Sequence, residues 1–75
     1  MIYLTKTDPA QNMARFYILD VQPTLLGDWS LTKEWGRLGR EGRQRNSSFG
    51  RRCDANVALT QELKRRLRRG YVVTQ

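Results

Sequence analysis

The sequence predicts an α+β protein in which a small antiparallel β-sheet of four to five strands carries one amphipathic α-helix across one face. A chain of 75 residues has room for one domain, residues 1–75, with a core made by one sheet and one helix or by three helices. The first two thirds of the chain hold short runs of β-forming residues separated by turn residues, and the last third changes to a helical period. A sheet with a helix on one face is the simplest compact arrangement of these elements.

Two strands are predicted before residue 24. Ile2–Lys6 is rich in β-forming residues and ends at the turn signal Thr7-Asp8-Pro9, which predicts an edge strand. Ala14–Val21 has apolar residues on both faces, which is typical of a central strand. Pro23 ends that strand because proline cannot donate a hydrogen bond to a neighbour, and residues 24–28 supply a loop.

A hairpin is predicted over the middle of the chain. Trp29–Trp35 alternates between apolar and polar residues, which predicts a half-buried strand with Trp29, Leu31 and Trp35 on one face. The glycines in residues 36–42 suit a tight connection. Arg43–Phe49 is the predicted return strand, although its composition is poor for β-structure, so the prediction rests on hairpin logic.

One helix is predicted from Arg52 to Arg69. Its apolar residues recur in steps of four, at Ala55, Leu59, Leu63 and Leu67. The polar residues assigned to its other faces are Gln61, Glu62, Lys64, Arg65 and Arg68. Gly70 follows where a left-handed cap is needed, and Tyr71-Val72-Val73 is either a final strand or a tail against the core.

The charge predicts an anionic partner. Fourteen Lys and Arg residues against seven Asp and Glu residues give a net charge of +7, and eleven of the fourteen cations are arginine. Arginine suits phosphate groups, although an arginine-rich composition also arises from genome base content. A membrane partner is not expected, because no segment approaches the about 20 apolar residues of a membrane span and the helix lacks aromatic anchors.

Catalysis is not expected. The chain has no histidine, which excludes the common nucleophile systems and histidine-containing metal sites, and its carboxylates are scattered. We therefore expect no enzyme activity, no cofactor and no metal. The one cysteine, Cys53, is expected to be a small core residue. The N-terminus does not have the pattern of a secretory signal, so a cytoplasmic location is expected. The chain is also expected to be a monomer.

The predicted hairpin concentrates positive charge beside a tryptophan. Arg37, Arg40, Arg43 and Arg45 surround the single carboxylate of Glu41. Such a cluster can follow a phosphate backbone, and Trp35 at its base can stack on a base or a sugar. The alternative is that Trp35 is an ordinary core residue and the glycines only form a turn. A second cluster, Lys64–Arg69, either stabilises the helix C-terminus or contacts phosphates.

The segment Trp35-Gly36-Arg37-Leu38-Gly39 resembles the WGR domain, a family named for its Trp-Gly-Arg motif. The similarity extends along nearly the whole chain and is closest to bacterial members. It is carried by Arg15-Phe16-Tyr17-x-Leu19-Asp20-x-Gln22-Pro23-Thr24-Leu25-x-Gly27-x-Trp29-Ser30-Leu31, by Glu34-Trp35-Gly36-Arg37-x-Gly39-Arg40-x-Gly42, by Phe49 and by Leu67-Arg68-Arg69-Gly70-Tyr71. One departure is Gly50-Arg51, where bacterial members often have Asp-Thr, and it weakens the predicted start of the helix.

The resemblance implies a compact antiparallel sheet with one helix and a role in binding DNA near strand breaks, as in DNA-dependent poly(ADP-ribose) polymerases. It assigns to Trp35 a contact with the nucleic acid at a 5′ end and to Arg37 a contact with DNA and a relay to neighbouring domains. Because we expect the domain to stand alone, such a relay would have to act on a separate protein or be absent. Gly36 and Gly39 would allow close approach of the backbone.

The leading hypothesis is a non-enzymatic module that binds nucleic acid, DNA above all. The expected binding residues are Trp35, Gly36, Arg37, Gly39, Arg40, Arg43 and Arg45. The alternative is a protein-interaction module whose basic face docks an acidic partner or a separate enzyme domain.

Overall fold

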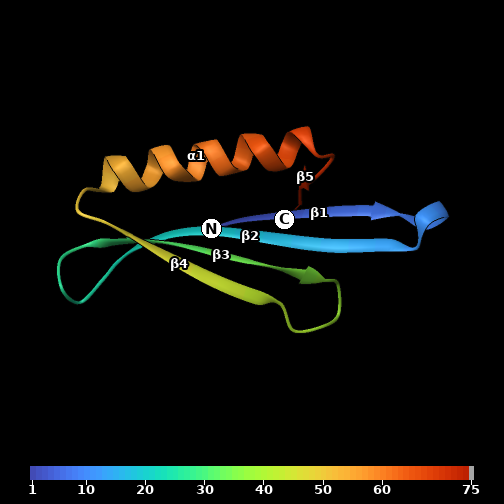
Figure 1. Cartoon of the computed structure of the whole chain (residues 1–75), viewed down its shortest axis with the longest axis horizontal. Helices are drawn as coiled ribbons and strands as arrows, with labels where there is room; N and C mark the ends of the chain where they lie inside the picture. The colour runs from blue at the N-terminus through green and yellow to red at the C-terminus, as the bar shows by residue number, and fades with distance from the viewer. Residues whose placement is uncertain (75) are drawn as a thin grey trace.

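The computed structural model describes residues 1–74 and has the α+β fold that the sequence predicts. Five strands form one antiparallel sheet in the order β4-β3-β2-β1-β5, and helix α1 lies across one of its faces (Figure 1). In chain order the elements are β1 (Ile2–Asp8), the 3₁₀ helix η1 (Pro9–Gln11), β2 (Met13–Pro23), β3 (Trp29–Arg37), β4 (Arg43–Phe49), α1 (Arg52–Arg68) and β5 (Val72–Val73).

The predicted central strand and hairpin are confirmed. β2 lies in the middle of the sheet, between β1 and β3, and β4 has the predicted bounds. The register pairs Tyr17 with Trp35 and Trp35 with Arg43. Trp29, Leu31 and Trp35 share the face that the helix covers, because side chains alternate along a strand and Leu31 belongs to the core beneath α1.

The prediction of an edge strand at Ile2–Lys6 is wrong. β1 continues to Asp8 and has a neighbour on each side, since Leu4 pairs with Tyr17 of β2 and with Val73 of β5. The cause is the turn after the helix. Tyr71 is buried and holds the chain so that the two residues of β5 lie along β1. Of the two predicted alternatives for this segment, the final strand is therefore confirmed and the unpaired tail is excluded.

The end of α1 is closed as predicted. Gly70 has φ of +96° and donates its N–H to the carbonyl of Leu67, while the N–H of Tyr71 bonds to the carbonyl of Arg66. This is the paired bonding of a Schellman cap, which stops the helix at Arg68, one residue before the predicted end. At the other end Arg51 occupies the cap position with no side-chain hydrogen bond, as the sequence predicts. No helix within residues 1–74 is long and apolar enough to cross a membrane.

The predicted burial of the helix is wrong at three positions. Glu62 is buried, whereas Leu67 is 45% exposed and Cys53 is exposed. A step of four residues overshoots a turn of 3.6 residues by about 40°, so a stripe built only of such steps rotates away from the sheet. Glu62 lies two turns beyond buried Ala55 and stays on the sheet side, and Cys53, two residues before Ala55, points away.

Candidate nucleic-acid interface

A pocket of about 420 Å³ lies between the C-terminal half of α1 and the sheet. Residues from β2, β3, α1 and the turn before β5 line it: Arg15, Tyr17, Trp35, Gly36, Arg37, Arg66 and Tyr71. Three of these seven residues are aromatic and three are arginines, so the pocket combines flat aromatic rings with positive charge. That combination suits a ring that carries or adjoins an anionic group.

Trp35 belongs to both the core and the pocket. It is half-buried and packs against the core cluster, and its ring stacks on Tyr17 with 5.9 Å between centroids and 16° between planes. Tyr71 meets Tyr17 edge-on, with centroids 6.0 Å apart. Trp35 therefore packs against the core and also lines the pocket. Its packing in the core does not exclude a contact with a ligand.

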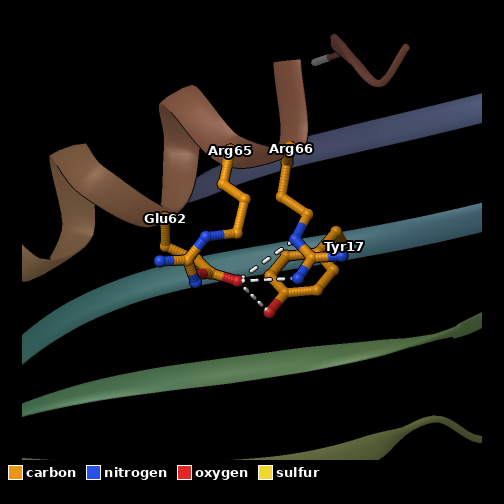
Figure 2. Close-up of polar contacts among 4 residues, drawn as sticks. All are labelled: Tyr17, Glu62, Arg65 and Arg66. Atoms are coloured by element: carbon orange, nitrogen blue, oxygen red, sulfur yellow. Dashed lines mark hydrogen bonds and ion pairs between the residues drawn. The ribbon is translucent and has the colours of Figure 1, made fainter. Parts of the chain in front are cut away.

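A hydrogen-bonded cluster joins the helix to the aromatic wall (Figure 2). The Tyr17 hydroxyl donates to Oε1 of Glu62 at 2.8 Å, and Nε of Arg66 donates to the same oxygen at 3.1 Å. The second carboxylate oxygen accepts from Arg65. The guanidinium carbon of Arg66 lies 4.5 Å from the centroid of the Tyr17 ring, within the range of a cation–π contact.

The two acidic groups in this cluster have shifted pKa values. Burial and the hydrogen bond to the Glu62 carboxylate together raise the pKa of the Tyr17 hydroxyl to about 12. Burial alone would also raise the pKa of Glu62, but the hydrogen bond from Tyr17 and the charge of Arg66 outweigh it, so that pKa lies below its usual value. At neutral pH the cluster therefore contains an ionised carboxylate between a neutral phenol and two guanidinium groups.

A row of cations continues the pocket across the sheet. The register places Lys6 opposite Arg15 and Arg15 opposite Arg37, on three neighbouring strands. These side chains share the helix-covered face, because each lies two residues from a pocket or core residue of its own strand. Like charges directly opposite one another destabilise a sheet, so the row favours an anion beside it.

The strand cations are segregated to one face. Strand alternation places all six on the helix-covered face: Lys6, Arg15, Lys33, Arg37, Arg43 and Arg45. The open face carries the carboxylates of Asp20 and Glu34 and none of these six cations. The positive charge of the strands therefore lies on the side of the sheet that holds Trp35.

The predicted binding residues do not all meet in the pocket. Trp35, Gly36 and Arg37 line it, and Arg43 lies opposite Trp35. Arg37 also donates from Nη1 to the carbonyl of Asn12 at 3.2 Å. Arg45 pairs with Lys33, one pair further along the same face. Arg40 and Gly39 are exposed in the turn between β3 and β4, outside the pocket lining.

The glycines of the motif have reasons internal to the fold. A Cβ on Gly42 would lie 2.5 Å from the carbonyl oxygen of Trp35, and one on Gly36 would lie 2.9 Å from the Cα of Gly42. Both would also crowd the Phe16 ring. Gly39 has φ of +83°, which the turn requires. These glycines close the hairpin that carries Trp35 and Arg37, and their approach to a ligand stays a prediction.

Four pocket residues are missing from the sequence-based site: Arg15, Tyr17, Arg66 and Tyr71. Arg15 was detectable in principle, since it precedes Tyr17 by two residues and so shares its face. Arg66 lies one turn after Glu62, so placing it beside the sheet requires knowing that Glu62 is on the buried side of the helix. Tyr71 follows the glycine cap, and no sequence pattern tells which way the chain turns there.

Comparison with known proteins agrees with this motif. The family model of the WGR domain matches residues 1–75, and WGR domains as a family bind nucleic acid. The chain is 37% identical over 70 residues to the uncharacterized protein y4dW of Sinorhizobium fredii; the match covers 93% of this chain and 34% of that protein. The chain thus spans about a third of its relative's length. No solved structure gives a significant match. The Trp-Gly-Arg segment at the pocket and the match along the chain show that this protein belongs to the WGR domain family.

Proposed function

We propose that the protein is a non-enzymatic DNA-binding module that holds the end of a duplex against Trp35. The observation that carries this proposal is the pocket in which an accessible indole lies among Arg15, Arg37 and Arg66. Stacking of a base on an aromatic side chain contributes about 1–3 kcal/mol, and the arginines supply the phosphate contacts that dominate affinity.

The site favours a duplex end over a duplex interior for a geometric reason. Inside a double helix every base face is covered by the next base pair, so an indole can stack only where the series ends or is interrupted. Trp35 lines the pocket beside a row of cations that suits the terminal phosphates. The contacts proposed are base stacking and phosphate contacts, so recognition would depend on DNA structure and not on base sequence.

The hairpin arginines extend the interface along the DNA. Arg43 and Arg45 lie on the same face of the sheet as Trp35, and exposed Arg40 lies in the turn beyond it. These side chains would follow the backbone behind the terminal base pair. For each phosphate that they neutralise, the logarithm of affinity should fall by about 0.9 more for every tenfold increase in salt concentration.

The test is fluorescence anisotropy of a labelled blunt DNA duplex, compared with the same sequence closed by hairpin loops at both ends. We expect the open duplex to bind more tightly, and we expect Arg37→Ala to lose more affinity than Arg51→Ala. Both variants remove one exposed arginine, but Arg51 lies at the far end of the helix from the pocket. Trp35→Leu, checked for folding by circular dichroism, should abolish the preference for open ends.

Three results would overturn the proposal. Equal affinity for open and closed duplexes would exclude recognition of an end. Equal losses in Arg37→Ala and Arg51→Ala would mean that only net charge matters. A protein with no DNA affinity whose basic face instead binds an acidic polypeptide would support the alternative of a protein-interaction module, and its binding would not quench Trp35 fluorescence by base stacking.

A further inference from the structure

Glu62 is the one buried charged residue among residues 1–74, and it contacts Tyr17 and Arg66, two of the residues that line the pocket. The residue is 5% exposed, and it lies on the sheet side of α1, between Ala55 and Arg66 in the sequence. The same helix face holds alanine and leucine elsewhere, so an apolar side chain would suit this position by pattern alone.

Neither stability nor attraction of an anion accounts for a carboxylate here. Removing a charge from water is costly, and replacing a buried ion pair by apolar residues is often neutral or stabilising. A carboxylate also subtracts positive charge from the very region that is expected to attract phosphate. What Glu62 does supply is two acceptor oxygens at a fixed point, toward which three side chains donate: Tyr17, Arg65 and Arg66 (Figure 2).

The contacts of Glu62 hold in place both the charged Arg66 and the aromatic Tyr17 of the pocket. Nε of Arg66 donates to Oε1, and Nη2 of Arg66 lies 3.0 Å from the same oxygen, so the guanidinium plane is held from one edge. Within residues 1–74 Nη1 of Arg66 has no recorded hydrogen bond, and Arg66 lines the pocket. The same Oε1 accepts from Tyr17, whose ring stacks on Trp35.

We propose that Glu62 is a positioning residue of the nucleic-acid pocket: it holds Arg66 and Tyr17 in the orientation that binds a phosphate and supports Trp35. This inference rests on the proposed function. A long arginine side chain loses rotamer freedom when it binds, and a side chain already held in place loses less. The carboxylate thereby strengthens binding of an anion although its own charge opposes it.

The two effects of Glu62 have opposite signs, which makes the test sharp. Glu62→Gln and Glu41→Gln each remove one carboxylate and raise the net charge of +7 by one. Glu41 is exposed in the hairpin turn among the arginines. With the blunt, 5′-phosphorylated DNA duplex as the probe, Glu41→Gln should bind more tightly than wild type. Glu62→Gln should bind about ten-fold more weakly, the scale of one hydrogen bond to a charged group.

A double-mutant cycle separates positioning from general loss of structure. Arg66→Lys keeps the charge but cannot present two N–H groups in a plane to one carboxylate, so it should weaken binding in the wild-type background. In the Glu62→Gln background the same substitution should change affinity by less than about two-fold, because a neutral amide no longer holds the guanidinium group by an ion pair. A merely structural Glu62 would leave the two losses additive. Melting curves confirm that each variant is folded at the assay temperature.

The outcomes are distinct. If wild type binds open duplex ends and Glu62→Gln binds as tightly as Glu41→Gln, or if the losses in the cycle are additive, the positioning role is excluded while the proposed function stands. If wild type does not bind the duplex, the proposed function itself fails. Should Glu62→Gln not fold, Tyr17→Phe decides: it keeps the ring stack but removes one donor to Glu62, and a loss of about three-fold is expected, whereas unchanged affinity would overturn the role.

Discussion

At the scale of single residues, the most informative side chains are those whose surroundings contradict their chemistry. Glu62 is a buried carboxylate and Trp35 is a half-buried indole that still lines a pocket. Sequence patterns assign apolar residues to the interior and polar residues to the surface. Neither of these two residues follows that rule, because Glu62 is buried and Trp35 lines a pocket. Trp35 was identified because the motif and its arginine neighbours single it out. Glu62 was misassigned because a polar residue in a helix is by default placed on the exposed side.

Tyr17 is expected to titrate late. Burial and the Glu62 carboxylate raise its pKa from the ordinary value for tyrosine, near 10, to about 12. The neutral phenol is therefore favoured by folding, and its contribution to stability is complete below pH 10 and is lost as the pH rises toward 12. The difference in tyrosinate absorbance between wild type and Tyr17→Phe isolates this group.

In Glu62→Gln the Tyr17 titration should move back toward the ordinary pKa, while the rise due to burial remains. A tyrosinate signal for Tyr17 that is complete near pH 10 in the wild-type protein would show that the hydroxyl is not held by the carboxylate.

At the scale of elements, the sequence predicts most of the sheet and helix, and the failures have specific causes. A run that is apolar on both faces predicts β2, alternation predicts β3, and the glycine-rich connection predicts β4 as the return strand of a hairpin, even though β4 has a poor composition for a strand. β1 was misassigned because its second neighbour, β5, has only two residues and depends on a long-range contact. The helix stripe was predicted from steps of four residues, which drift about 40° each and so leave Leu67 exposed.

The hairpin between β3 and β4 should be sensitive to one methyl group. Gly42→Ala would place a Cβ 2.5 Å from the carbonyl oxygen of Trp35 and 2.7 Å from the Phe16 ring, so backbone must shift. We expect a loss of about 2 kcal/mol in the free energy of unfolding by urea.

Gly50→Ala is the matched control for Gly42→Ala. An added Cβ there meets nothing within 4 Å, and Gly50 is not among the positive-φ residues. Its stability should change by less than about 0.5 kcal/mol. Equal effects at the two positions would contradict the close contact at the base of the hairpin.

At the scale of the whole molecule, charge divides the protein into two unlike faces. The helix-covered face carries the strand cations, and the open face carries Asp20 and Glu34. The sequence predicts a net charge of +7 but not this segregation, because alternation assigns sides only once the pairing register and the position of the helix are known. The same register gathers Lys6 and Arg15, far apart in sequence from Arg37, into one row.

A cation added to the open face should therefore contribute little to binding. Asn46→Arg places a new arginine on β4 with its side chain on the open face, one residue from Arg45. We expect affinity for the duplex to rise by less than about two-fold and the salt dependence to stay nearly unchanged, because a phosphate counterion is released only where contact is made. A clear increase in both would mean that DNA reaches the open face.

The protein contains its own control for the central claim, because its two tryptophans lie at opposite ends of β3. Trp35 lines the pocket, whereas Trp29 pairs with Phe49 and lies beneath Arg52 at 5.2 Å. Each indole N–H gives a separate signal in a nitrogen–proton correlation spectrum, so one titration with a blunt DNA duplex observes both rings. We predict that the Trp35 signal shifts or broadens while the Trp29 signal does not move. A titration in which Trp35 stays unchanged as DNA binds would contradict the account.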